Sequence, residues 1–214
     1  MHRPDYYDYA PTVAIERHVS LISLLTAETR AIAYRVAALS GLRFVDLDRL
    51  IEHEFGSSVR SLVSQEGEAG YRERERRVLR SALADSPPAV ISLGDGALMD
   101  PGSRELVTQR TLLIGFDLDL PNCLWRVRDA QHRLELRATR ESAVLRRPVE
   151  VTTESWHPLF GEIDDLDDLR PYYQQRRVGL DAAHRLLPAR GQSIERLADQ
   201  VLEILEGRAT RKTS

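Results

Sequence analysis

Residues 18–46 read HVSLISLLTAETRAIAYRVAALSGLRFVD, and this stretch decides the class of fold. Its first part, residues 18–25, is short, apolar and rich in branched side chains, which is typical of a buried parallel strand. Residues 27–39 then carry apolar side chains at helical spacing, and Gly41 is placed to end that helix. Residues 42–46 resume a strand. The sequence therefore predicts a strand–helix–strand unit.

The same alternation continues to the end of the chain. Further strands are predicted within residues 89–99 and 111–119, with a weaker one over 183–189, and further helices from Asp48, over 71–83 and over 193–208. Strands separated by helices indicate an α/β protein, a three-layer αβα arrangement with a parallel sheet of about five strands covered on both faces. In such sheets, ligands bind beyond the carboxyl ends of the strands.

One domain of ordinary composition is expected. Its predicted parts are an N-terminal extension (1–17), a single domain (18–206) and a C-terminal tail (207–214). Within the domain, residues 137–168 are polar and irregular, as in a lid insertion.

Charge, hydropathy and cysteine content exclude several classes of protein. The 33 acidic and 30 basic residues give a net charge of −3, which argues against nucleic acid as a partner. We expect neither a membrane span nor an export signal, and a single cysteine, Cys123, is expected to pack in the core of a cytoplasmic protein. A small-molecule ligand is the expected partner, and a protein partner or a homo-oligomer remains open.

Lysine occurs at one position only, Lys212, so the other 29 basic residues are arginine. The folded domain therefore cannot use a mechanism that requires a lysine, such as a Schiff base or phosphate binding by the lysine of a Walker A loop.

Residues 44–79 and the following strand carry a set of motifs in a fixed order. The motifs are Asp46-x-Asp48, Ile51-Glu52 with Gly56, Gly67-Glu68-Ala69-Gly70-Tyr71-Arg72 leading to Glu75, and Gly94-Asp95-Gly96. In this order and spacing they resemble the shikimate kinase family. The weaker likeness extends from about His18 to Leu205.

The resemblance implies a nucleoside-monophosphate-kinase-like fold of the P-loop kinase type and a set of site residues. Asp48 matches a carboxylate that bonds substrate hydroxyls and, in an active enzyme, assists proton removal; Arg72 matches an arginine that binds the substrate carboxylate. The other positions that match the family are Gly94, Gly96 and Arg147 of the lid on the substrate side, and Arg140 on the nucleotide side. Asp95 and Arg170 are further substrate-side candidates and Arg30 a further nucleotide-side candidate, at positions where the family has other residues.

The residues alone support the same site, with an alternative. Asp46 and Asp48 follow one strand, and residues 94–96 follow a strand that should lie beside it, so acid and arginine meet at one edge. Alternatively, Asp48 only caps the next helix, and Arg72 only pairs with Glu75 or Glu68 on a solvated face.

The sequence departs from the family at the phosphate site. The family's G-x-x-x-x-G-K-[ST] loop aligns with residues 23–30, where Ser23 and Glu28 replace the glycines, Thr29 the lysine and Arg30 the magnesium-binding hydroxyl. Arg30 carries the charge of the lost lysine, but one residue later on a helix it is rotated by about 100°.

Two departures lie on the substrate side. Asp95 replaces the middle glycine of a G-G-G turn and adds an acid where an anion would approach. A second carboxylate-binding arginine is expected where this chain has Leu169, and Arg170, Arg176 and Arg177 are the candidates to replace it.

These features lead to three hypotheses. The first is a shikimate-kinase-like protein that has lost phosphoryl transfer and binds a small cyclic carboxylate or related metabolite in a binding or regulatory role, with no cofactor. The second is an active small-molecule kinase that uses ATP and magnesium through a remodelled phosphate site containing Arg30, Arg140 and Arg147. The third is an interaction partner of an active enzyme, marked by an apolar surface patch. The histidines and the acidic run 162–168 lack metal-ligand spacing, so no metal site is expected.

Overall fold

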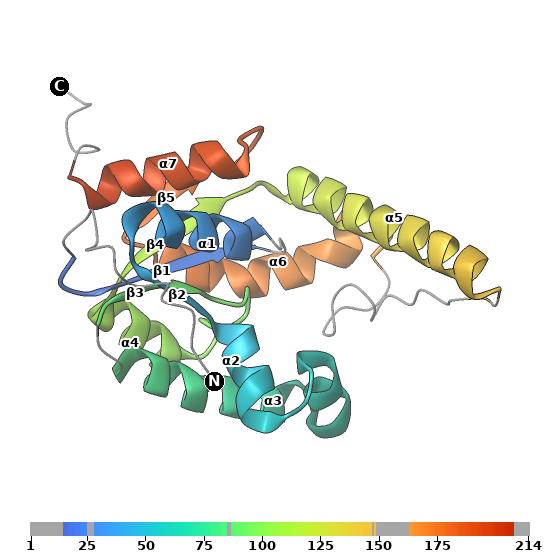
Figure 1. The fold of residues 1–214 in the computed structure, drawn as a ribbon, viewed down its shortest axis with the longest axis horizontal. Helices are drawn as coiled ribbons and strands as arrows, with labels where there is room; N and C mark the ends of the chain where they lie inside the picture. The colour runs from blue at the N-terminus through green and yellow to red at the C-terminus, as the bar shows by residue number, and fades with distance from the viewer. Residues whose placement is uncertain (1–14, 25–27, 85–86, 147, 149–162, 208–214) are drawn as a thin grey trace, which may run out of the picture.

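A parallel sheet of five strands, in the order β2-β3-β1-β4-β5, forms the centre of the computed structural model (Figure 1). The structure describes residues 15–24, 28–84, 87–146, 148 and 163–207. The strands are β1 His18–Ser23, β2 Arg43–Asp46, β3 Ala89–Ser92, β4 Thr111–Asp117 and β5 Arg185–Pro188. Every pairing is parallel, so all five carboxyl ends meet at one edge of the sheet.

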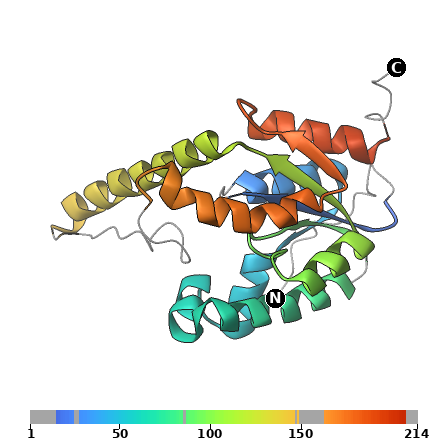
Figure 2. The same cartoon turned by 180° about the vertical axis from the view of Figure 1, so that it is seen from behind.

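Helices cover both faces of this sheet. They are α1 Glu28–Ser40, α2 Leu47–Phe55, α3 Val59–Ala84, α4 Pro101–Arg110, α5 Leu120–Leu145, α6 Leu166–Asp181 and α7 Ile194–Leu205. The helices α1 and α7 pack together on one face, and Figure 2 shows α6 and α4 on the other. The predicted fold class is therefore confirmed.

The core is built around β1, whose six residues are all buried. Leu21 and Ile22 have no exposed surface, and they pair with Ile114 and Gly115 of the neighbouring strand β4. The polar residues His18, Ser20 and Ser23 are buried together with the apolar ones, so the strand is covered on both faces.

The helix α3 is kinked at Gly67, which adopts φ 72° and ψ 176°. This backbone conformation is open essentially to glycine alone. The kink turns the preceding segment so that the Glu66 carboxylate pairs with Arg74, eight residues further on, and Arg74 Nε donates to Glu66 Oε2 over 2.6 Å. The predicted helix over 71–83 is the second half of α3.

The structure differs from the sequence expectation around the lid. Residues 137–145, expected to be irregular, continue α5, which projects from the body in both views (Figures 1 and 2). The start of this polar helix is stabilised by an N-cap, because the Asp119 side chain accepts from the backbone N–H of Asn122 over 2.9 Å. The sequence also does not predict the helix α4. Arg147 and residues 149–162 lie outside the described residues.

Candidate functional site

Asp48 and Tyr71 join two helices at the carboxyl end of β2. The cap of α2 is Asp46, which accepts from the backbone N–H of Arg49 over 3.4 Å, so Asp48 is not the capping residue. Asp48 lies in the first turn, and the hydroxyl of Tyr71 donates to its Oδ1 over 3.3 Å. The alternative in which Asp48 only caps the helix therefore fails.

Arg72 is held by two carboxylates of its own helix. Its Nη1 donates to Glu75 Oε2 over 2.8 Å, and its Nη2 donates to Glu68 Oε1 over 3.1 Å. Glu75 and Glu68 are the partners that the alternative interpretation of the sequence gives to Arg72. However, Glu75 is buried and the Arg72 side chain is only 16% exposed, so these ion pairs do not lie on a solvated face. A Cβ added at Gly96 would lie 2.1 Å from Arg72 Nη2. Because Gly96 has no side chain, the Arg72 guanidinium can occupy this space.

The structure separates the three candidates for a second arginine. Arg176 is 1% exposed, and its Nε lies 3.4 Å from Asp95 Oδ2. Arg170 is half exposed and pairs with Asp167 over 3.3 Å, away from this pair. Arg177 turns to the other side of α6, where its Nη1 lies 2.6 Å from an oxygen of Asp117. Arg176 is thus the arginine that meets the Gly94–Gly96 turn.

Seven side chains form what we call the charged cluster. Its members are Asp48, Glu68, Tyr71, Arg72, Glu75, Asp95 and Arg176. They come from α2, α3, α6 and the turn after β3, and they contain the predicted substrate-side residues Asp48, Arg72 and Asp95, with Gly94 and Gly96 beside them.

Burial changes the acidity of two carboxyl groups in the cluster. It raises the pKa of Asp48 to about 6, and the charges of Asp46 and Asp95 add to this. Burial also raises the pKa of Glu75 to about 7, although the Arg72 charge opposes the shift. Burial raises the pKa of Tyr71, which therefore remains a phenol that can donate. The cluster takes up and releases protons near neutral pH.

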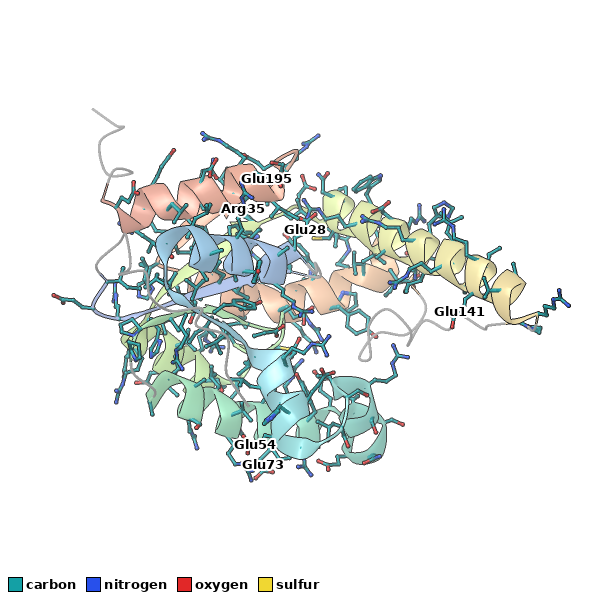
Figure 3. All side chains as sticks on the ribbon, viewed as in Figure 1. Glu28, Arg35, Glu54, Glu73, Glu141 and Glu195 are labelled. Atoms are coloured by element: carbon teal, nitrogen blue, oxygen red, sulfur yellow. The ribbon has the colours of Figure 1, made fainter. Side chains whose placement is uncertain are left out.

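The residues at the family's phosphate-loop positions contact one another. Ser23 Oγ and Thr29 Oγ1 lie 2.5 Å apart in a buried hydrogen bond, and Glu28 forms an ion pair with Arg126 of α5. Figure 3 shows Glu28 between the starts of α1 and α5. Arg30 lies 2.8 Å from Asp46 through its Nε. A MgATP polyphosphate fits this residue set poorly, because a carboxylate and two bonded hydroxyls replace the glycines and the lysine.

A small cavity lies beside the described side chains at these positions. A cavity of about 10 Å³ is lined by Ser23, Glu28, Ile32, Phe116, Leu118, Arg126, Ala189 and Leu197. That volume corresponds to roughly one water molecule. Arg140, the other nucleotide-side candidate, is exposed on α5.

A hollow of about 660 Å³ lies elsewhere. It is lined by Phe55, Glu66, Gly70, Glu73, Arg74, Arg76, Arg77 and Arg80 on the outer side of α2 and α3, where Figure 3 labels Glu54 and Glu73. Three of its arginines already pair with Glu66, Asp100 and Glu54. It contains none of the predicted site residues, and we assign it no ligand.

Other expectations concern metal, membrane and thiol chemistry. Within the described residues, no group of three or more His, Cys, Asp or Glu side chains is arranged to hold a metal ion. None of the described helices is both long and apolar enough to cross a membrane. Cys123 is buried, and burial raises the pKa of its thiol to about 12, so it is not a nucleophile.

A sequence model of the shikimate kinase family matches residues 30–206. The chain belongs to the shikimate kinase family. It is 34% identical over 150 residues to the shikimate kinase of Paramagnetospirillum magneticum, covering 70% of this chain and 74% of that one. It is 33% identical over 147 residues to that of Xanthomonas oryzae pv. oryzae, covering 68% and 78%.

Solved structures of the shikimate kinase family share the fold. The shikimate kinase of Bacteroides thetaiotaomicron has a TM-score of 0.68 at 22% identity, with 89% of this chain and 98% of that one covered. The shikimate kinase of Acinetobacter baumannii, solved in complex with shikimate, has a TM-score of 0.63 at 20% identity, with 91% and 96% covered. The family match begins at Arg30, the last position of the aligned phosphate loop.

Proposed function

We propose that this member of the shikimate kinase family binds a small cyclic carboxylate in a binding or regulatory role and does not transfer a phosphoryl group. The observation that carries the proposal is the ion pair between Glu28 and Arg126 at the phosphate-loop position. An acid stands there in place of a glycine, and its charge opposes a polyphosphate. ATP and magnesium are therefore not expected as cofactors.

On the substrate side, the ligand would be held by Arg72 and Asp48. Arg72 supplies a charge-assisted contact to a carboxylate, and Asp48 accepts from ring hydroxyls. Gly94 and Gly96 would let the ring approach the backbone. Arg147 stays a prediction for the closing lid, and Arg170 and Arg176 are the candidates for the second carboxylate contact. A binding role would use occupancy of this site, without turnover.

Thermal unfolding of the purified chain tests the proposal. Millimolar MgATP, shikimate and a panel of cyclic carboxylates are added separately, since a ligand at a hundredfold excess over its Kd stabilises the native state by about 2.7 kcal/mol. We expect a carboxylate to raise the melting temperature and MgATP to leave it unchanged. Arg72→Ala should abolish the carboxylate shift, and an unchanged shift in that variant would refute the assignment of Arg72.

A shift with MgATP would instead support the active small-molecule kinase. The observation that favours this second candidate is family membership itself, because the similar relatives are named shikimate kinases. In that case Asp48 would be the catalytic carboxylate, and Arg30, Arg140 and Arg147 would hold phosphate groups. A coupled assay of ADP release would then be the next measurement.

The interaction-partner hypothesis requires a contiguous apolar patch. The exposed large apolar side chains are spread over α1, α2, α5, α6 and β5: Tyr34, Leu39, Leu50, Trp125, Leu136, Val144, Val178 and Leu186. Single exposed apolar residues are normal on a protein surface, so this distribution favours the ligand-binding proposal.

A further inference from the structure

Two guanidinium groups of the charged cluster converge on one carboxylate oxygen. Glu68 Oε1 lies 3.1 Å from Arg72 Nη2 and 3.9 Å from Arg176 Nη2. The arginines belong to different helices, α3 and α6, so the packing of the fold creates this point. A single anion there contacts both cations.

Each guanidinium also forms an ion pair with a second carboxylate that is less exposed than Glu68. Arg72 Nη1 pairs with Glu75 over 2.8 Å, and Arg176 Nε pairs with Asp95 over 3.4 Å. The side chains of Glu75 and Asp95 are only 3% and 13% exposed. Each arginine therefore has a counter-ion besides Glu68. Arg72 donates to Glu68 Oε1 through both Nε and Nη2, and Arg176 turns its Nη2 toward the same oxygen.

Glu68 differs from these buried counter-ions in two ways. Its side chain is 46% exposed, and it follows directly after the kink at Gly67. An ion pair with an exposed partner contributes little stability, whereas removing the partner of a buried charge is costly. Among the carboxylates around the two arginines, Glu68 is the one that can leave at low cost.

We propose that Glu68 is an internal competitor for the ligand: its carboxylate occupies an anion site formed by Arg72 and Arg176, and the carboxylate of a small cyclic acid displaces it. The inference rests on the proposed function, which supplies that acid. It makes Arg176 the second carboxylate-binding residue. Only a charged carboxylate can replace the Glu68 carboxylate between the two guanidinium groups. The site therefore selects a carboxylate over its ester or amide.

Calorimetric titration of the full chain with shikimate, and with its neutral methyl ester, tests the displacement. In Glu68→Gln, shikimate should bind about tenfold more tightly than in the unmodified chain, because one competing charge is removed. The affinity for the methyl ester should not change. Glu66→Gln is the matched control, because Glu66 is an acid two residues away that pairs with Arg74 outside the cluster.

Arg176→Lys tests the second arginine while keeping the charge beside Asp95. We expect it to bind the ester as before and to lose most of its preference for shikimate over the ester. If Arg176→Lys fails to fold, the double variant Arg176→Met/Asp95→Asn removes the buried pair together, and the same loss of preference is expected. An unchanged preference in the folded variant overturns the role of Arg176.

The outcomes separate this inference from the proposed function. Equal shikimate affinity in the unmodified chain and in Glu68→Gln, with binding lost in Arg72→Ala, overturns the internal competitor and leaves the proposed function intact. Shikimate binding only in Glu68→Gln supports the competitor and counts against a carboxylate ligand for the unmodified chain. No shikimate binding in Glu68→Gln overturns the competitor.

Discussion

Gly96 sets the position of Arg72 at the level of single residues. A Cβ at Gly96 would lie 2.1 Å from Nη2 and 2.6 Å from Cζ of Arg72. At Gly94, two positions earlier, an added Cβ would meet Asp48 Oδ1 and Glu75 Oε1 at 3.4 Å, which is close to ordinary contact. The two glycines therefore provide a matched pair for substitution.

We expect Gly96→Ala to displace the Arg72 guanidinium and weaken carboxylate binding at least tenfold, at a cost in stability of about 1–3 kcal/mol. Gly94→Ala should fold with a smaller loss. The shift in melting temperature with a bound carboxylate measures both effects. Equal carboxylate binding in the two variants would contradict the role given to Gly96.

The raised pKa values of Glu75 and Asp48 predict how stability depends on pH. In the folded chain these groups have pKa values of about 7 and about 6, against ordinary values of 4.5 and 3.8. Between those limits the folded state binds more protons than the unfolded state, so the free energy of unfolding falls as pH rises. We expect a higher melting temperature at about pH 5 than at about pH 8.

Glu75→Gln should flatten this dependence, because glutamine does not titrate. Glu73→Gln, which changes an exposed acid on the same helix, should keep the full slope. Melting curves over this pH range measure both variants. A slope in Glu75→Gln as steep as in the unmodified chain would show that another group is responsible.

At the scale of elements, the kink in α3 places Glu68. Gly67→Ala puts a side chain on a backbone conformation that is essentially restricted to glycine, which costs on the order of 1–3 kcal/mol. We also expect the substitution to straighten α3, which would break the ion pair between Glu66 and Arg74 and move Glu68 away from Arg72. Chemical denaturation measures the cost, with Ser64→Ala, an exposed position before the kink, as the control.

Helix packing explains why the sequence left the second arginine open. The helix α6 approaches the body closely at Gly179, where a Cβ would lie 2.8 Å from Leu98 Cβ. This approach is a tertiary contact, and it decides which of Arg170, Arg176 and Arg177 faces the turn at Asp95. Local spacing carries no such information, whereas the motifs around Arg72 lie on contiguous segments and could be identified from their order.

The positions of the strands along the chain could be predicted because each strand is a short apolar run between helices. The long helix α5 could not, since its sequence is polar and Trp125, near its start, is 65% exposed. Polar composition favoured a loop beyond residue 137, whereas the cap at Asp119 and intrahelical bonding extend the helix to Leu145.

At the scale of the whole molecule, one edge of the sheet carries both the charged cluster and the phosphate-loop positions. Arg30 of α1 pairs with Asp46 at the end of β2, and the Asp46 charge contributes to the raised pKa of Asp48. The two halves of the edge are thus joined by an ion pair. A change at the phosphate-loop positions is expected to alter the substrate side.

The proposed function expects no nucleotide binding, and restoring the four phosphate-loop residues tests whether these positions account for that expectation. The variant Ser23→Gly/Glu28→Gly/Thr29→Lys/Arg30→Ser supplies the glycines, the lysine and the hydroxyl of the family motif. We expect MgATP to raise its melting temperature, and magnesium alone to have no effect. A variant that folds without any response to MgATP would contradict the assignment of nucleotide binding to these four positions.

The burial of Cys123 has a practical consequence for spectroscopy. It is the sole cysteine of the chain, its sulfur lies 3.6 Å from the carbonyl oxygen of Leu118, and burial keeps it a protonated thiol. Maleimide dyes react with thiolates, so the native chain should stay unlabelled. A cysteine introduced at exposed Arg137 on the projecting α5 would then carry the single fluorophore, and changes in its emission would report ligand-dependent movement of that arm.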